Sequence, residues 1–328
     1  MTAPLLLDAI ADDARRIAAL SRDMGGHVSI DPEMLLQRDI ALQPPGLWSP
    51  NRHCRLVQAR DGWMAVNLAR QDDLASVAAW LECDDADAPW DAVIGLVKER
   101  ATADLLERSI LLGMPVSVVG EAPLAQASEL HPATRPERAL KVLDLSALWA
   151  GPLCGALLAD AGLEVTKVQD PARPDPTAVA TPVHHQRLNG RKSHVSMTLA
   201  SSAVGAALDR CDVLITSARP HALARLGLTP DAVFDRHPQL IWVAITAHGF
   251  IGDNAMRVGF GDDTAAAGGL ISRVDGAPSF LGDALADPLT GLRAAHLALR
   301  AIVEARAGLI DVALASSAAD FARRAGLR

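Results

Sequence analysis

The feature that most constrains the fold is a regular alternation of short β-branched runs and helix-like segments in the second half of the chain. The strand-like runs are KVLDLS, EVTKVQ, DVLITS and LIWVAIT, and the helix-like segments between them are PLCGALLADAG, SSAVGAALDRC and TPDAVFDRHP. Strands that alternate with helices in this way predict a parallel, doubly wound sheet. We therefore expect an α/β fold with a Rossmann-like parallel sheet domain over residues 138–328.

The first part of the chain has a different pattern and predicts a second, smaller α+β domain. Residues 1–20 form an amphipathic helix pattern, and CRLVQARDGWMAVNLA indicates two strands joined at Asp61-Gly62. Two helical patterns, DDLASVAAWLE and TADLLERSILLG, and a short strand, PVSVV, follow. Pro and Gly then punctuate the chain at 121–137. We predict a small domain over 1–120 and a linker over 121–137.

Charge and composition exclude several classes of partner. The net charge of −8 among 328 residues argues against nucleic acid. The apolar stretches are too short or too interrupted by charge to span a bilayer, so no membrane partner is expected. The four cysteines are scattered without a CxxC pair, which indicates buried thiols in a reducing cytoplasm. We expect a cytoplasmic protein.

Common catalytic motifs are missing from the sequence. It has no GxGxxG after a strand and no GxxxxGK[ST], which argues against a nicotinamide dehydrogenase and an ATPase. It has no GxSxG, the usual elbow of α/β-hydrolases. The ten histidines form no HExxH, and His184-His185 fits a surface loop pair better than a metal site. We expect no metal.

Two groups of basic residues indicate anion recognition. Ligands on doubly wound sheets bind beyond the carboxyl ends of the strands. Arg219 and Arg225 follow one strand end, and Arg187, Arg191 and Lys192 form a cluster in a loop before another strand. Each alone is more typical of a solvated surface charge. Together, at one sheet edge, they are suited to a phosphorylated ligand.

A pair of carboxylates gives candidate catalytic groups in addition to the basic residues. Asp283 and Asp287 lie in FLGDALADPLTGLRAAH, whose flanks are too apolar for a surface turn. A solvated loop, or a helix N-cap at Asp287 before Pro288, is the alternative explanation. Modest desolvation would raise the pKa of Asp287 and still leave it ionised at neutral pH. Phosphate-binding arginines and a carboxylate in an apolar junction suggest acyl chemistry on a nucleotide-bearing carrier.

At this point the chain resembles the family III CoA-transferases. The segment VLDLSALWAGPLCGALLADAGLEVTKVQDP is similar to the first βαβ unit of that family. The resemblance continues through RLNGRKSHVSMTL, CDVLITSARPHALARLGL, HPQLIWVAITAHG, FLGDALADPLTGLRAAHLAL and LIDVALASSAADF, in family order over most of 138–321. The N-terminal unit resembles the small domain of the same family, which ordinarily comes later in the chain. The chain therefore resembles a circularly permuted member.

The resemblance also implies site residues, one position at a time. The catalytic carboxylate of the D-x-x-[TG]-G motif falls on Asp287, with Gly291 closing the motif. The CoA-binding positions fall on Trp149, Ala150, Met197, Thr198, Leu199, Ala200, Ser217, Ala218, Arg219 and Arg225. The implied activity is transfer of CoA from an acyl-CoA to a carboxylic acid, through a mixed anhydride and an aspartyl-CoA thioester. CoA is then a substrate, no cofactor is tightly bound, and the family's assembly implies a homodimer.

Departures from the family pattern leave two alternatives open. Gln169-Asp170 replaces the usual Glu-Arg, so one phosphate or adenine contact is missing unless Arg173 substitutes. The racemase branch carries a His-Asp pair where this chain reads Gly259-Phe260-Gly261, so an acyl-CoA racemase or isomerase needs His248 or Asp262 as its second base. The other alternative is a non-catalytic CoA-binding homologue.

Overall fold

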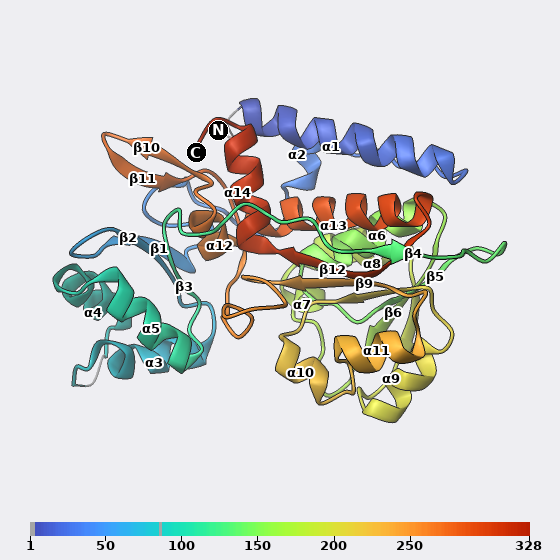
Figure 1. Ribbon diagram of the computed structural model, residues 1–328. Helices are drawn as coiled ribbons and strands as arrows, with labels where there is room; N and C mark the ends of the chain where they lie inside the picture. The colour runs from blue at the N-terminus through green and yellow to red at the C-terminus, as the bar shows by residue number, and fades with distance from the viewer. Residues whose placement is uncertain (1–3, 85–86) are drawn as a thin grey trace.

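The computed structural model describes residues 4–84 and 87–328, and it is built around a seven-stranded sheet (Figure 1). Its order is β4-β12-β9-β8-β5-β6-β7, and all neighbours pair in parallel except β4, which runs antiparallel to β12. The strands are β4 (His131–Pro132), β5 (Lys141–Asp144), β6 (Glu164–Gln169), β7 (Ser193–Ser196), β8 (Val213–Thr216), β9 (Ile241–Thr246) and β12 (Arg306–Ala313). The predicted α/β fold is confirmed.

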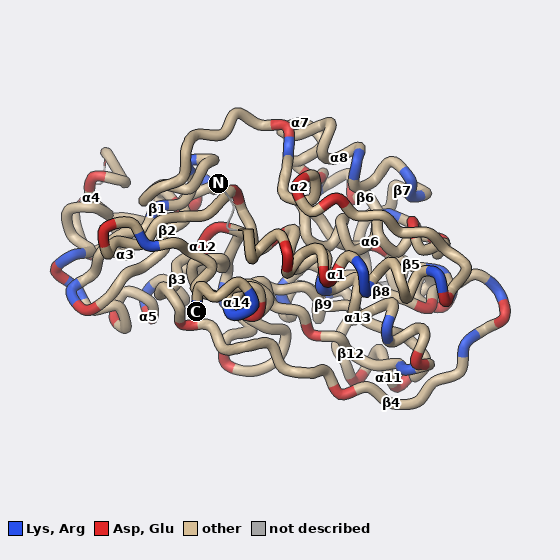
Figure 2. Tube along the Cα trace, turned by 90° about the horizontal axis from the view of Figure 1, so that it is seen from above, with Lys and Arg blue, Asp and Glu red and all other residues tan. Residues whose placement is uncertain are grey.

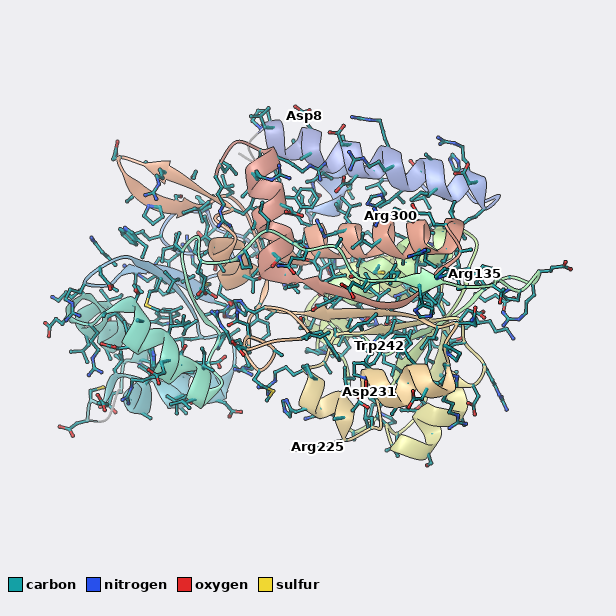
Figure 3. The ribbon with its side chains drawn as sticks, in the orientation of Figure 1. Asp8, Arg135, Arg225, Asp231, Trp242 and Arg300 are labelled. Atoms are coloured by element: carbon teal, nitrogen blue, oxygen red, sulfur yellow. The ribbon has the colours of Figure 1, made fainter. Side chains whose placement is uncertain are left out.

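Helices cover both faces of this sheet. Successive residues of a strand point to opposite faces, so strands with apolar residues at every position need a covering layer on each side. Val213 and Ile215 of β8 enter one apolar core and Leu214 between them enters the other. The first face is covered by α6 (Ala150–Asp160) and α13 (Ala286–Val303), and the second by α9 (Ser201–Leu208), α10 (Pro220–Ala224) and α11 (Pro230–Arg236) (Figure 1). Figure 3 shows Trp242 between the sheet and this second layer.

The N-terminal helix packs on the large sheet unit. In α1 (Pro4–Asp23), Leu6, Ile10 and Ile17 are fully buried in the same core as α13. α14 (Leu314–Arg324) lies beside both, and Arg324 donates to the carboxylate of Asp13 at 2.8 Å. The short helices α2 (Pro32–Leu35), α7 (Thr177–Ala180) and α8 (Pro182–Asn189) complete this unit. The domain boundaries stay a prediction, but α1 belongs to the core of the large unit.

A smaller antiparallel sheet of order β1-β2-β3 forms a separate unit and does not extend the large sheet. Cys54 pairs with Asn67 and Gln58 with Trp63, so the hairpin turns at Asp61-Gly62 as the sequence predicted. The elements are β1 (Cys54–Gln58), β2 (Trp63–Asn67), β3 (Val116–Val118), α3 (Gln71–Leu81), α4 (Pro89–Leu96), the 3-10 turn η1 (Val97–Glu99) and α5 (Thr102–Leu112).

Helix α12 (Gly261–Ala267) joins the two units (Figure 1). It contacts β2 and β3 on one side and α14 on the other, and every residue in it is buried. Ala266 packs with Leu56 of β1 and with the hairpin β10 (Ile271–Val274) and β11 (Ala277–Phe280) through Ile271 and Phe280. This helix was not distinguished in the sequence, because its residues are buried on all sides and show no clear period. The helix expected to start near Pro288 is α13, which begins at Ala286.

Charged residues of both signs are interspersed over the two units (Figure 2). Within the described residues, none of the helices combines the length and the apolar character that a bilayer crossing requires. Helices α1 and α14 contact each other, and a Cβ on Gly326 would lie 3.9 Å from the side chain of Leu5.

Candidate active site

A cavity of about 530 Å³ opens at the carboxyl edge of the parallel sheet, where the strand order predicts a ligand. Its walls come from the turn before α6, the loop after β8, the loop after β9 and the residue before α3 in the small unit. Asp287 is the one carboxylate among its described lining residues. The arginines that line it are Arg70, Arg173, Arg219, Arg225 and Arg257.

Half of the residues that the sequence analysis placed in the site line this one cavity. They are Ala150, Ser217, Ala218, Arg219, Arg225 and Asp287. Arg225 lies at the end of α10 (Figure 3), and Arg173, considered only as a substitute for a missing contact, lines the cavity as well. Arg70 and Arg257 were not foreseen, because no local motif marks an arginine that reaches the site from another unit or from a loop.

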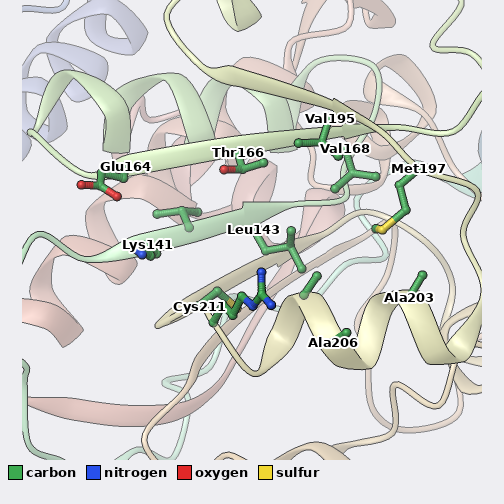
Figure 4. Close-up of a pocket in the computed structure, with 13 residues that line it drawn as sticks. Lys141, Leu143, Glu164, Thr166, Val168, Val195, Met197, Ala203, Ala206 and Cys211 are labelled. Atoms are coloured by element: carbon green, nitrogen blue, oxygen red, sulfur yellow. The ribbon is translucent and has the colours of Figure 1, made fainter.

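The other predicted CoA contacts lie outside the cavity. Met197 lines a different cavity of about 480 Å³, between β5, β6 and α9 (Figure 4). Thr198 and Ala200 are exposed beside it, and Leu199 packs against the second core. Trp149 is buried under the α6 terminus, with its ring 4.6 Å from that of His184.

Gly291 has a packing position inside α13. A Cβ there would lie 2.7 Å from the carbonyl oxygen of Ala150 and 2.9 Å from the Cβ of Leu153. Glycine is therefore what allows α13 to cross α6 closely. Inside a helix, each backbone N–H donates to the carbonyl oxygen four residues earlier. The N–H of Gly291 is therefore already engaged, and the position of Gly291 favours a packing role over a hydrogen bond to a substrate oxyanion.

The predicted basic cluster does not form a phosphate site. Its residues are on α8 and the turn after it, and each has a structural partner. Lys192 is buried against Asp144 at 2.8 Å, Arg191 pairs with Asp160 at 2.7 Å, and Arg187 donates to the carbonyl of Met34 at 3.0 Å. The sequence did not indicate these partners, because Asp144, Asp160 and the Met34 carbonyl are all distant from the cluster in sequence.

Three further aspartates surround Asp287 in a buried cluster: Asp262 and Asp263 in the first turn of α12, and Asp283 before α13. The Nδ2 of Asn51 donates to Asp262 at 2.7 Å and to Asp283 at 2.6 Å, and the backbone N–H of Ala284 donates to Asp262 at 2.7 Å. Arg38 forms a two-pronged pair with Asp283, from Nε at 2.5 Å and Nη2 at 2.8 Å. Asp263 accepts from Asn67 at 3.1 Å.

Backbone geometry brings Asp287 against α12. Ala284 has a left-handed φ of 46°, and the N–H of Asp287 bonds the Ala284 carbonyl at 3.0 Å. A Cβ at Gly261 would lie 2.3 Å from Oδ2 of Asp287, so only glycine fits there. The helix begins at Ala286 with Leu285 as its N-cap. Asp287 is therefore a first-turn residue and not the N-cap that the sequence offered as an alternative.

The pKa values of Asp287, Asp262 and Asp263 are raised, mainly because burial disfavours the charged form. Burial, with the charges of Asp262 and Asp283, raises the pKa of Asp287 to about 7, against the opposing effects of Arg38 and the Gly261 N–H. Burial and Asp283 raise the pKa of Asp262 to about 6, and burial raises that of Asp263 to about 8. The desolvation of Asp287 is therefore larger than the modest effect expected from sequence.

Three of the cavity arginines are available for an anion. In the described part of the chain, Arg173, Arg219 and Arg225 take part in no ion pair. Arg70 pairs with Asp73, and Arg257 pairs with Glu121 at 2.5 Å. Partial burial and the facing charge of Arg70 lower the pKa of Arg219. A cation held near another cation favours a bound anion such as phosphate.

The two candidate second bases are placed differently. His248 lines a separate cavity of about 630 Å³ with Asp311 and the linker, and burial lowers its pKa to about 3. Asp262 adjoins Asp287, but Asn51 and the Ala284 N–H already bond both of its oxygens. Neither has the placement of a free base across the cavity from Asp287.

The chain is an α/β protein with a doubly wound sheet, and the arginine-lined cavity at the carboxyl edge of that sheet, with the Asp287 carboxylate in its wall, is suited to an anionic small molecule. Comparison with known proteins identifies the family: CoA-transferase family III matches residues 138–325, and the chain belongs to this family. The resemblance seen in the sequence is thereby confirmed.

Individual relatives cover part of the chain. It is 30% identical over 194 residues to the probable fatty acyl-CoA transferase Rv3272 of Mycobacterium tuberculosis, covering 54% of this chain and 49% of that protein. It is 31% identical over 185 residues to the succinyl-CoA–D-citramalate CoA-transferase of Chloroflexus aurantiacus, covering 51% and 45%. The crystal structure of Rv3272 superposes with a TM-score of 0.52 at 29% identity, over 59% of this chain and 58% of that one. The chain thus spans about half the length of the curated relatives it matches.

Within residues 4–84 and 87–328, no group of three or more His, Cys, Asp and Glu side chains has an arrangement that could hold a metal ion.

Proposed function

We propose that this protein is an acyl-CoA:carboxylate CoA-transferase in which Asp287 is the covalent nucleophile. The observation that carries the proposal is one cavity that combines the Asp287 carboxylate with Arg173, Arg219 and Arg225, which form no ion pair with any residue that the structure describes. The arginines are suited to the phosphates of CoA, and the carboxylate is suited to the thioester at its other end. CoA and its thioesters are the substrates, and no tightly bound cofactor is part of the proposal.

The reaction proceeds by four acyl transfers. The Asp287 carboxylate attacks the thioester carbonyl, the C–S bond breaks, and a mixed anhydride and CoA thiolate form. The thiolate attacks the Asp287 carbonyl of the anhydride, which releases the donor acid and leaves an aspartyl-CoA thioester. The acceptor carboxylate then attacks the carbonyl of this thioester, the C–S bond breaks, and a second anhydride and CoA thiolate form. The thiolate attacks the acceptor carbonyl, which gives the new acyl-CoA and regenerates Asp287.

The buried setting of Asp287 suits these intermediates. Anhydrides and thioesters hydrolyse in water, so the site must exclude it. Asp287 lies among buried residues of α12 and α13, and Gly261 leaves room for its carboxylate against the start of α12. The proposal further includes a homodimer in a reducing cytoplasm, which is supported by the family and by four free thiols.

The proposal is tested by mass spectrometry of the intact protein after incubation with a panel of acyl-CoAs. A transferase gains the mass of CoA less water, and loses it when an acceptor acid is added. A racemase instead exchanges the α-hydrogen of its substrate with deuterated solvent and needs no acceptor. A chain that binds acyl-CoA without either reaction is a non-catalytic homologue, and that result would overturn the proposal.

A further inference from the structure

We propose that Arg38, in the segment between α2 and β1, is a positioning residue for the Asp287 nucleophile: by pairing with Asp283 it leaves Asp287 as the carboxylate that loses its proton and attacks. This inference rests on the proposed function and assigns a role to a residue outside the large parallel sheet. Arg38 lies before residues 138–325, which match the family and contain Asp283 and Asp287.

The hydrogen bonds of the cluster show how the donors are distributed. Both prongs of Arg38 are directed to Asp283, whose side chain is 2% exposed, while that of Arg38 is 21% exposed. Asn51 bridges Asp283 and Asp262 through one nitrogen. The side-chain donors therefore hold Asp283 and Asp262, and Asp287 keeps its oxygens for the cavity apart from the Gly261 N–H.

Arg38 is itself held in place from the opposite side. Its guanidinium lies 5.6 Å from the centroid of the Trp149 ring, a distance at which the cation is attracted to the ring face. Trp149 in turn meets His184 of α8 edge to face, with an interplanar angle of 80°. This explains why Trp149, which the family resemblance placed among the CoA contacts, is buried away from the cavity: it supports the arginine.

The charges around Asp287 make this pairing consequential. Within the cluster it faces Arg38, Asp262 and Asp283, with Asp263 following on α12. Across the cavity are the arginines Arg70, Arg173, Arg219, Arg225 and Arg257. Like charges buried together cannot all ionise. Without Arg38, the charge on Asp283 is uncompensated, and the cluster retains a proton that can only be removed at higher pH.

The test is the pH dependence of aspartyl-CoA formation, followed by mass spectrometry in wild type and Arg38→Met. The rate in wild type rises as Asp287 loses its proton. In Arg38→Met we expect this rise to move up by about one pH unit or more, so that the rate near pH 7 falls about tenfold and the two proteins converge near about pH 9. Arg38→Lys keeps a cation and moves the rise less. Arg22→Met, an exposed arginine at the end of α1, is the matched control and leaves it unchanged.

The double variant Arg38→Met/Asp283→Asn separates charge compensation from mere structural support. Removing the uncompensated carboxylate should return the pH dependence to the wild-type position, and it also protects the fold from a buried unpaired charge. If Arg38→Met lowers the rate equally at every pH, or if the double variant is not rescued, the inference is wrong. If the wild-type protein forms no thioester at any pH, the proposed function itself is contradicted. This result differs from those that contradict only the role of Arg38, so the two failures are distinguishable.

Discussion

Arg219 and Arg225 test the cavity as a CoA site at the level of single side chains. Each is free of ion pairs in the described residues and lines the cavity that contains Asp287. A charged hydrogen bond to phosphate contributes roughly 1.5–3 kcal/mol, so replacing either arginine with Ala should weaken CoA binding about 10- to 150-fold in calorimetry. Binding of a pantetheine analogue without phosphates should change little. Equal losses for both ligands would show that these arginines do not contact phosphate.

Asp287 also makes a testable contribution to stability. Its pKa is raised to about 7 in the folded chain, first by burial, so the folded state binds this proton more tightly than the unfolded state. Stability from this group is therefore present at low pH and is lost as pH rises through about 7. An Asp in the unfolded chain has a pKa of about 3.9, so the loss begins near about pH 4 and is complete above about pH 7. Asp287→Asn should match wild type near about pH 3 and be more stable by on the order of 4 kcal/mol near about pH 8, measured by urea unfolding. A difference that does not depend on pH would contradict this pKa shift.

Residue roles were predictable from sequence only where a motif fixed them. The D-x-x-[TG]-G spacing selected Asp287, and the strand-end pattern selected Arg219 and Arg225, all of which line one cavity. Arg38 and Asn51 carry no such signal, because their roles come from contacts with Asp283 more than 200 positions away. Lys192 was misinterpreted for a similar reason, since it lies in a turn and its partner Asp144 ends β5, 48 positions earlier.

At the scale of elements, the crossing of α6 and α13 depends on Gly291. A Cβ there would approach the carbonyl of Ala150 to 2.7 Å, so Gly291→Ala must push the helices apart and move the cavity wall at Ala150. Overpacking of this kind typically costs about 1–3 kcal/mol, which we expect as a lower urea midpoint together with reduced CoA affinity. Gly95→Ala in α4 is the control: a Cβ there meets nothing within 4 Å, and stability should stay equal or rise. A neutral Gly291→Ala would refute the packing role.

Elements with a regular pattern were the predictable ones. The strands over 164–169 and 241–246 and the helix over 102–112 appear in the structure where the sequence placed them. Helix α12 could not be predicted from the sequence. It is buried on every side and so has no polar face, and the glycines of GFGDDTAAAGG have weak helix propensity. It nevertheless carries Asp262 and Asp263 and joins the two units.

At the scale of the whole molecule, we propose that the small α+β unit has been moved by circular permutation to the start of the chain. Chain termini that lie close together make such a rearrangement inexpensive, and here the first and last helices, α1 and α14, contact each other. A variant whose ends are joined by a short flexible linker and whose chain is opened within 121–137 should fold and form the same thioester. Loss of folding in that variant, with wild-type folding intact, would count against the permutation.

The proposed homodimer is a second property of the whole molecule. The family's assembly implies it, although the permuted order changes how two chains could interlock. We expect sedimentation of a dimer at micromolar concentration in analytical ultracentrifugation. A single species with the mass of one 34.5 kDa chain would contradict it.

The most direct test of the account is to trap the covalent intermediate and locate it. Wild-type protein incubated with a reactive acyl-CoA is treated with hydroxylamine, and the modified residue is mapped by peptide mass spectrometry. The account predicts a hydroxamate at Asp287, none in Asp287→Asn, and a reduced yield still located at Asp287 in Asp283→Asn. Modification at Asp283, or full transferase activity in Asp287→Asn, would contradict the central claim.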